Sequence, residues 1–160
     1  MNKNKVVTQI IAAVERSLES SMAAAKQAHE TATHKESVAK TKYDTFGLEA
    51  SYLAHGQYKR VLELEEAFEA FKNLPIVEFS DDDEITVSAL IRLESMEGDT
   101  CTLFIGPSGG GMKVECDSVE VIVVTAEAPL GRKLLGKWVG DEVSFSMDNS
   151  VKTFGIVEIL

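Results

Sequence analysis

The chain has 160 residues and a formal net charge of −10, a length that accommodates one ordinary domain or two small ones. The acidic balance argues against stable binding of duplex DNA, which relies on cations that neutralise phosphates. Two cysteines are too few for a disulfide framework or a four-thiolate zinc site. No apolar run approaches the ~20 residues of a membrane span, and Gln9, Glu15 and Arg16 interrupt the apolar stretch near the start. We therefore expect a soluble, cytoplasmic protein without a signal peptide.

Two long helical patterns occupy the first half of the chain. Residues 6–42 contain no proline or glycine, and a second pattern ends near Phe71. Apolar or small residues recur in both with the alternating three-four spacing of a coiled-coil seam: Ile11, Val14, Leu18, Ser21, Ala25, Ala28, Ala32 and Ala39, then Val61, Leu64, Phe68 and Phe71. A short break at residues 42–49 separates the patterns. Two helices joined by such a break fold back as an antiparallel hairpin.

The start of the first helix extends beyond its partner. A turn centred near Thr45 and Phe46 places Leu18 opposite Asn73, so residues 6–14 have no counterpart in the second helix. This segment carries Val6, Val7, Ile10, Ile11 and Val14, which would form a sizeable apolar patch if exposed. We expect it to pack on the C-terminal half of the chain or on a second copy.

The second half of the chain changes from helical to strand periodicity. Pro75 ends the second helix, because proline disfavours helical geometry in the residue before it. Seven segments rich in Val, Ile, Phe and Thr are predicted strands: residues 76–79, 85–93, 100–105, 112–116, 119–125, 143–147 and 153–160. A short helix is expected at residues 129–135, with Pro129 at its first position and Gly136 as its cap. The prediction is an α+β protein with a coiled-coil hairpin domain at residues 1–74 and a β-rich domain at residues 75–160.

The glycine-rich segment GPSGGGMK, residues 106–113, does not fit a phosphate-binding loop. Lys113 does not directly follow the last glycine, no Ser or Thr follows it, and strands rather than a helix come next. We expect a hairpin loop between two strands instead. In that hairpin Cys101 and Cys116 would lie nearly opposite each other, although a reducing cytoplasm disfavours a disulfide.

Residues 128–143 read APLGRKLLGKWVGDEV and resemble the C-terminal signature of the bacterial Gre factors, GreA and GreB. The family pattern is roughly SPLARALLGK, a short variable step and then GDxV. Here Ala128 replaces the serine, Gly131 replaces an alanine, and Trp138 follows the Gly-Lys pair. The layout of a helical hairpin, a proline-marked junction and a β-rich end also agrees with this family.

The resemblance implies an FKBP-like C-terminal domain that docks on bacterial RNA polymerase and a coiled coil that enters the polymerase secondary channel. It places the polymerase contact at or near Pro129, Arg132 and Lys133. Basic residues on the family's coiled coil face the RNA 3′ end. Their counterparts here are Lys35, Lys40 and Lys42, for which ordinary helix solubilisation is the alternative explanation.

The tip of the family's hairpin reads roughly GDLR/KENAEY, and its Asp and first Glu assist RNA cleavage. This chain reads YDTFGLEASY at residues 43–52, so Asp44 matches the Asp, and Glu49 is the counterpart of the Glu, five residues on instead of three. Phosphodiester hydrolysis at a two-metal site needs both cations about 4 Å apart. The polymerase is expected to hold one, and the two carboxylates can recruit the second Mg²⁺ and orient the attacking water. Both residues also have structural explanations, Asp44 as a helix N-cap and Glu49 as a first-turn residue.

These observations leave several functions open. The leading hypothesis is a factor, not an enzyme by itself, that binds RNA polymerase and stimulates cleavage of backtracked RNA near the nascent 3′ end. It would bind no cofactor alone and would share Mg²⁺ with the polymerase active site. A near alternative is a Gre-like factor that occupies the channel and inhibits or modulates the polymerase without cleavage.

Two further classes are a prolyl isomerase or chaperone, suggested by the FKBP-like fold, and a structural coiled-coil adaptor. Such isomerases line their pocket with several aromatics, and the β-rich domain offers a short set: Phe79, Phe104, Trp138, Phe145 and Phe154. In the adaptor, residues 6–14 would drive dimerisation.

Overall fold

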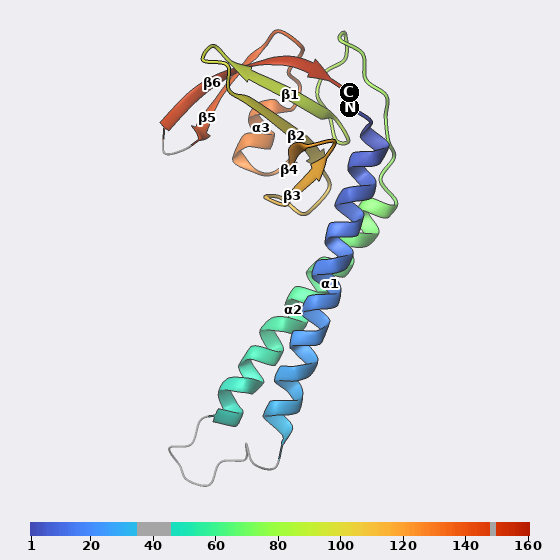
Figure 1. Ribbon diagram of the computed structural model, residues 1–160, viewed down its shortest axis with the longest axis vertical. Helices are drawn as coiled ribbons and strands as arrows, with labels where there is room; N and C mark the ends of the chain where they lie inside the picture. The colour runs from blue at the N-terminus through green and yellow to red at the C-terminus, as the bar shows by residue number, and fades with distance from the viewer. Residues whose placement is uncertain (35–45, 148–149) are drawn as a thin grey trace. The chain divides into compact units, whose positions relative to one another are not determined.

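A computed structural model describes residues 1–34, 46–147 and 150–160. Its helices and strands are α1 (Lys3–Thr33), α2 (Phe46–Lys72), β1 (Leu90–Ser95), β2 (Thr100–Gly106), β3 (Lys113–Cys116), β4 (Val119–Thr125), α3 (Pro129–Leu134), β5 (Glu142–Met147) and β6 (Ser150–Ile159) (Figure 1). The expected α+β class is confirmed, since two long helices precede a six-stranded mixed sheet.

Internal contacts divide the chain into two compact units. Residues 1–12 and 70–160 form one, here named the β unit, and residues 13–69 form the other, the hairpin unit. The sequence predicted two domains, residues 1–74 and 75–160. Contacts alone do not show which segments fold independently, so this boundary stays a prediction. Within the described ranges, no helix is both long and apolar enough to cross a membrane.

The hairpin unit is built from the parts of α1 and α2 that run side by side (Figure 1). The predicted seam residues Ala25, Ala28, Val61 and Leu64 are all buried, which agrees with the three-four spacing. The predicted break at residues 42–49 extends too far, because α2 already begins at Phe46.

The strands follow the order β3-β4-β2-β1-β6-β5 across the sheet. β2 and β4 are parallel, while the other neighbouring pairs are antiparallel. The predicted hairpin across the glycine-rich loop is therefore wrong, because β4 lies between β2 and β3 and pairs with both. Cys101 on β2 and Cys116 on β3 are buried free thiols separated by a strand, not cross-strand neighbours.

Two predicted strand segments also differ from the structure. Residues 76–79 form no strand: the Val77 N–H donates to Ser88 Oγ at 3.2 Å, and the Val77 carbonyl accepts from Lys3 Nζ. The strand predicted at residues 85–93 begins at Leu90, because Ser88 has a φ of 75°, a left-handed conformation that interrupts an extended run. The apolar pattern did not report burial throughout these segments, because Val77 and Val87 are both exposed.

One face of the sheet packs against α3. Apolar side chains from β1, β2, β5 and β6 form a single buried cluster with Leu134 of α3, which is fully buried. Phe154 of β6 stacks on Phe145 of β5 within this region, with ring centroids 4.8 Å apart. The short helix therefore holds its place by inserting an apolar residue into the main core.

The opposite face of the sheet is covered by the end of α2. Phe71 is buried, and its ring centroid lies 6.4 Å from that of Phe104 on β2. A Cβ added at Gly106 would come within 2.9 Å of both the Phe71 ring and Val123 on β4. Gly106 thus leaves the space that Phe71 fills against the sheet.

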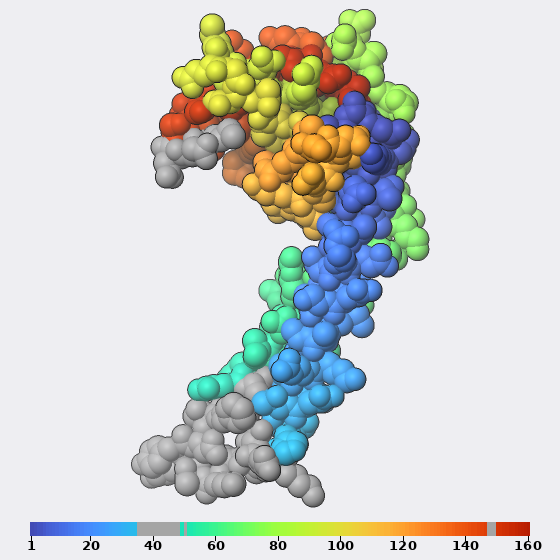
Figure 2. Space-filling model, in the orientation of Figure 1, coloured from blue at the N-terminus to red at the C-terminus, as the bar shows by residue number. Residues whose placement is uncertain are grey.

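The first turns of α1 complete the β unit. Val6 and Ile10 are fully buried, and Lys5 forms an ion pair with Asp117 in the turn after β3. Figure 2 shows this start of α1, in dark blue, lying against the orange segment around β3. Residues 6–12 therefore pack on the C-terminal half of the chain, which is the first of the two arrangements expected for this apolar segment.

Lys3 is the unusual member of this N-terminal segment, because it is buried. Its Nζ donates to the Val77 carbonyl and lies 4.5 Å from the centroid of the Phe79 ring. Burial lowers the pKa of Lys3, while the nearby Glu78 carboxylate acts in the opposite direction. The carbonyl and the aromatic face replace part of the hydration that the ammonium group loses.

Phe71→Ala should lower the free energy of unfolding of the β unit by about 3–5 kcal/mol, because it leaves a cavity against β2. Urea unfolding followed by the emission of Trp138, the single tryptophan, measures this change. Tyr58→Ala on the same helix is the control, since Tyr58 is 48% exposed and should shift stability by only about 0.5 kcal/mol. An unchanged unfolding midpoint for Phe71→Ala would show that the sheet does not depend on this ring.

Candidate functional site

The segment with the Gre-like signature folds as α3 and the turns that follow it. Pro129 occupies the first turn of α3, where its missing N–H costs nothing, and the preceding Ala128 is extended. The Ala128 N–H donates to the Thr125 carbonyl at 3.1 Å, so α3 starts directly from the end of β4. The helix ends at Leu134, and Gly136 follows with a φ of 74°, as the predicted glycine cap requires.

Gly131 determines how closely α3 approaches β4. A Cβ at this position would overlap the Thr125 carbonyl oxygen and lie 2.9 Å from the Thr125 carbonyl carbon. Both are backbone atoms, which cannot move aside like the end of a flexible side chain. The glycine that stands here in place of the Gre alanine is therefore a packing requirement of this chain.

The three residues expected to contact a polymerase all lie on this one helix. Pro129, Arg132 and Lys133 are exposed, while Leu134 faces the core. Lys133 Nζ donates to the Ser144 carbonyl of β5 at 2.9 Å. Because β5 is at the edge of the sheet, this bond occupies an edge carbonyl and gives Lys133 a structural role beside any docking role.

The turn after α3 presents Trp138 at the surface. Its side chain is 45% exposed, whereas its backbone N–H donates to Asp141 Oδ2 at 2.9 Å. The Asp141 N–H in turn donates to the Trp138 carbonyl at 3.1 Å. The sequence analysis identified Trp138 as a departure from the Gre pattern but did not predict that it is exposed. The one local indication was its position two residues before Gly140, in a segment expected to turn.

The other candidate site lies at the end of the hairpin. Glu49 is in the first turn of α2, as its structural explanation predicts, and its side chain is exposed. The remaining predicted tip and RNA-facing residues, Asp44, Lys35, Lys40 and Lys42, lie outside the described residues. The structure therefore locates one of the two proposed metal-binding carboxylates and leaves their pairing as a prediction.

Glu49 borders a groove of about 420 Å³ between α1 and α2 within the hairpin unit. Small and polar residues of α1, including Ala28 and Thr31, form one wall, and Leu53 and Gln57 of α2 form the other. Among the described residues, no group of three or more His, Cys, Asp or Glu side chains could hold a metal ion.

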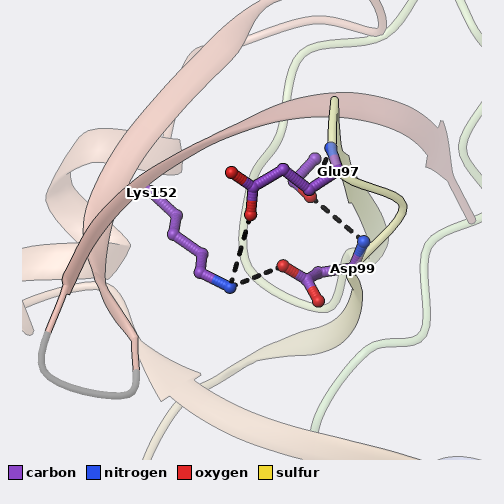
Figure 3. Close-up of polar contacts among 4 residues, drawn as sticks. Glu97, Asp99 and Lys152 are labelled. Carbon is purple, nitrogen blue, oxygen red and sulfur yellow. Dashed lines mark hydrogen bonds and ion pairs between the residues drawn. The ribbon is translucent and has the colours of Figure 1, made fainter.

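A cluster of charges that the sequence did not suggest joins β6 to the β1–β2 turn of the β unit. Lys152 of β6 reaches Asp99 Oδ2 at 2.6 Å and Glu97 Oε2 at 3.8 Å in the β1–β2 turn (Figure 3). The hydrogen bond from Lys152 lowers the pKa of Asp99. Ser95 Oγ accepts from the backbone N–H groups of Glu97 and Asp99 at 3.2 and 3.1 Å, which fixes the turn. These contacts hold the β1–β2 turn against β6.

No protein-family model and no curated protein matches this sequence. Among solved structures, the chain is similar to the GreA factor homolog 1 (Gfh1) protein of Thermus thermophilus, with 18% identity and a TM-score of 0.39 over 94% of each chain. Another structure of the transcription factor Gfh1 shows 21% identity and a TM-score of 0.41 over 93% of this chain and 92% of that one.

A third similar structure is the prokaryotic transcription elongation factor GreA/GreB from Nitrosomonas europaea. It shows 17% identity and a TM-score of 0.35, and the match covers 70% of this chain and 91% of that one. At these identities and scores, the likenesses assign neither a family nor a function to this chain.

Gly131→Ala should destabilise the β unit by about 1–3 kcal/mol, because the added methyl group overlaps backbone at the end of β4. Helix propensity alone predicts the opposite sign, a gain of about 1 kcal/mol. Gly56→Ala is the matched control: Gly56 lies inside α2 with nothing within 4 Å of an added Cβ, so its helix should gain stability. Thermal unfolding followed by circular dichroism and Trp138 emission measures both changes, and a stabilised Gly131→Ala would contradict the packing argument.

Proposed function

We propose that this chain is a Gre-like transcription elongation factor that acts on bacterial RNA polymerase in the cytoplasm. The β unit would dock on the polymerase, and the hairpin tip would enter the secondary channel and stimulate cleavage of backtracked RNA. The observation that carries the proposal is the run at residues 128–143, which matches the Gre signature and forms α3, its capped end and the start of β5. Its apolar residue Leu134 is buried while Arg132 and Lys133 are exposed, so the helix leaves these two side chains at the surface, where a partner could reach them.

The hairpin supports the second part of the proposal. A pair of long helices ending in carboxylates is suited to delivering charge into a narrow site, and Glu49 is exposed at the start of α2. Asp44 would be its partner, and Lys35, Lys40 and Lys42 would lie near the RNA 3′ end. The polymerase would supply the catalytic centre and a firmly held Mg²⁺, so the factor would not be an enzyme by itself.

A second candidate keeps the docking and omits the cleavage. Glu49 lies five residues after Asp44 rather than three, and the asparagine of the Gre tip is missing. A tip with this altered spacing would occupy the channel and inhibit or modulate the polymerase. By contrast, the isomerase hypothesis gains nothing from one pocket of the β unit, of about 210 Å³, because the residues that line this pocket include no aromatic side chain.

The decisive experiment uses purified polymerase complexes stalled in a backtracked state. The parent protein should shorten the RNA, and Asp44→Ala should slow cleavage by about 10- to 100-fold, as expected when a group that holds a catalytic metal is lost. Glu49→Ala should lose a smaller part and recover partly at higher Mg²⁺, because a weakened metal site fills at higher concentration. The double variant should be little worse than Asp44→Ala, since the two carboxylates act as a unit.

Glu65→Ala serves as the control, because Glu65 is an exposed glutamate of α2 about four helical turns beyond Glu49. It should cleave like the parent. If the parent binds the polymerase but never shortens the RNA, the channel-occupying candidate is correct. If the parent does not bind the polymerase at all, both candidates are wrong.

A further inference from the structure

A small pocket of the β unit, of about 210 Å³, has no role in the proposed function. It lies over three neighbouring strands, β2, β1 and β6 (Figure 1). Thr102, Arg92 and Glu158 stand opposite one another in the strand register and form a polar row across these strands. Leu90 and Leu160 lie two residues along from Arg92 and Glu158, so the same face carries an apolar row beside the polar one. The pocket is therefore amphipathic.

Thr102 is the informative member of the polar row. It is only 8% exposed, and in the described part of the chain its side-chain hydroxyl has no hydrogen-bond partner. Buried hydroxyl groups usually have a partner, because otherwise they lose the hydrogen bonds that they make to water. No fully enclosed side-chain polar atom of the described residues lacks a partner, so this hydroxyl keeps access to solvent, and Thr102 lines the pocket. A molecule bound there can supply the missing partner.

Arg92 and Glu158 carry the charges among the described residues that line the pocket. The guanidinium donates from Nε to Glu158 Oε2 at 3.1 Å, while its two terminal nitrogens have no partner within the described ranges. Arg92 therefore keeps donors, and Glu158 keeps acceptor capacity, for a further molecule. Glu94 adds a second carboxylate on this face, two residues from Arg92 and away from the apolar row. It disfavours a ligand with a net negative charge.

We propose that this pocket binds a free α-amino acid with an apolar side chain. Its α-carboxylate accepts hydrogen bonds from Arg92 and Thr102, and its α-ammonium donates to Glu158. Its side chain lies against Leu90 and Leu160. Adjacent opposite charges repel one end of any singly charged ligand, so a zwitterion fits them best. The pocket is smaller than the about 300–1,000 Å³ of sites for drug-sized ligands, which suits a metabolite of this size.

A titration of ¹⁵N-labelled full-length protein with L-leucine tests this site directly. Leucine should give saturable shifts centred on the amides of residues 90–92, 102 and 158–160. A Kd of about 1 mM or tighter is expected for a ligand of about nine non-hydrogen atoms. N-acetyl-leucine lacks the ammonium and leucinamide lacks the carboxylate. Each should bind about tenfold more weakly or worse, because each loses one charge-assisted hydrogen bond.

Three variants test the named side chains. Arg92→Gln and Glu158→Gln should each weaken leucine binding about tenfold or more, and Thr102→Val, which keeps the side-chain shape, about threefold or more. Lys113→Gln is the matched control and should bind leucine like the parent. Lys113 and Glu120 form another half-exposed ion pair across neighbouring strands, with Nζ and Oε1 2.9 Å apart, and neither lines the pocket.

The ligand series uses the parent protein, so it decides the question even if a variant fails to fold. Equal binding of leucine and N-acetyl-leucine would indicate a site for anions and overturn the zwitterion, as would equal binding of leucinamide. The absence of saturable shifts, or shifts confined to residues 13–69, would overturn the pocket as the site. None of these outcomes involves the polymerase, so the proposed function and the amino-acid site stand or fail separately.

Discussion

The central constraint on this structure is that β2 and β4 are apolar on both faces. They form the single parallel pair among the described strands, and parallel strands are stable when both faces are covered. α3 covers one face with Leu134, whereas Phe71 and the first turns of α1 belong to the other. The ends of the long helices are therefore part of the β unit's core, although the rest of each helix builds the hairpin unit.

The same constraint accounts for the shape of the candidate docking site. α3 must lie flat against the end of β4, which is why Gly131 has no room for a methyl group. With Leu134 committed to the core, the remaining side of a six-residue helix is free to carry cations. The proposed interface is thus a consequence of how the sheet is covered, and the turn that follows α3 adds the exposed Trp138 to it.

Sequence reasoning succeeded where the decisive information was local. The hairpin followed from three-four spacing, β4 was predicted with its observed bounds, and α3 followed from Pro129 and Gly136. It failed where distant partners decided the outcome, because nothing local indicates that β4 inserts between β2 and β3. The Lys133 bond to β5 and the burial of Lys3 are non-local in the same way. For the candidate site, the helix that groups Pro129, Arg132 and Lys133 was predictable, whereas the preorganised turn under Trp138 was not.

The insertion of β4 between the two cysteine-bearing strands has a consequence for handling the protein. Cys101 and Cys116 are separated by two strand spacings, about 9.5 Å, while a disulfide needs Cα atoms closer than about 7 Å. Burial also raises the pKa of Cys101, which keeps that thiol protonated and slow to react. A disulfide joining the two would therefore require the native pairing of β2, β4 and β3 to be broken. Its appearance on a non-reducing gel would mark molecules that have lost this strand order during preparation.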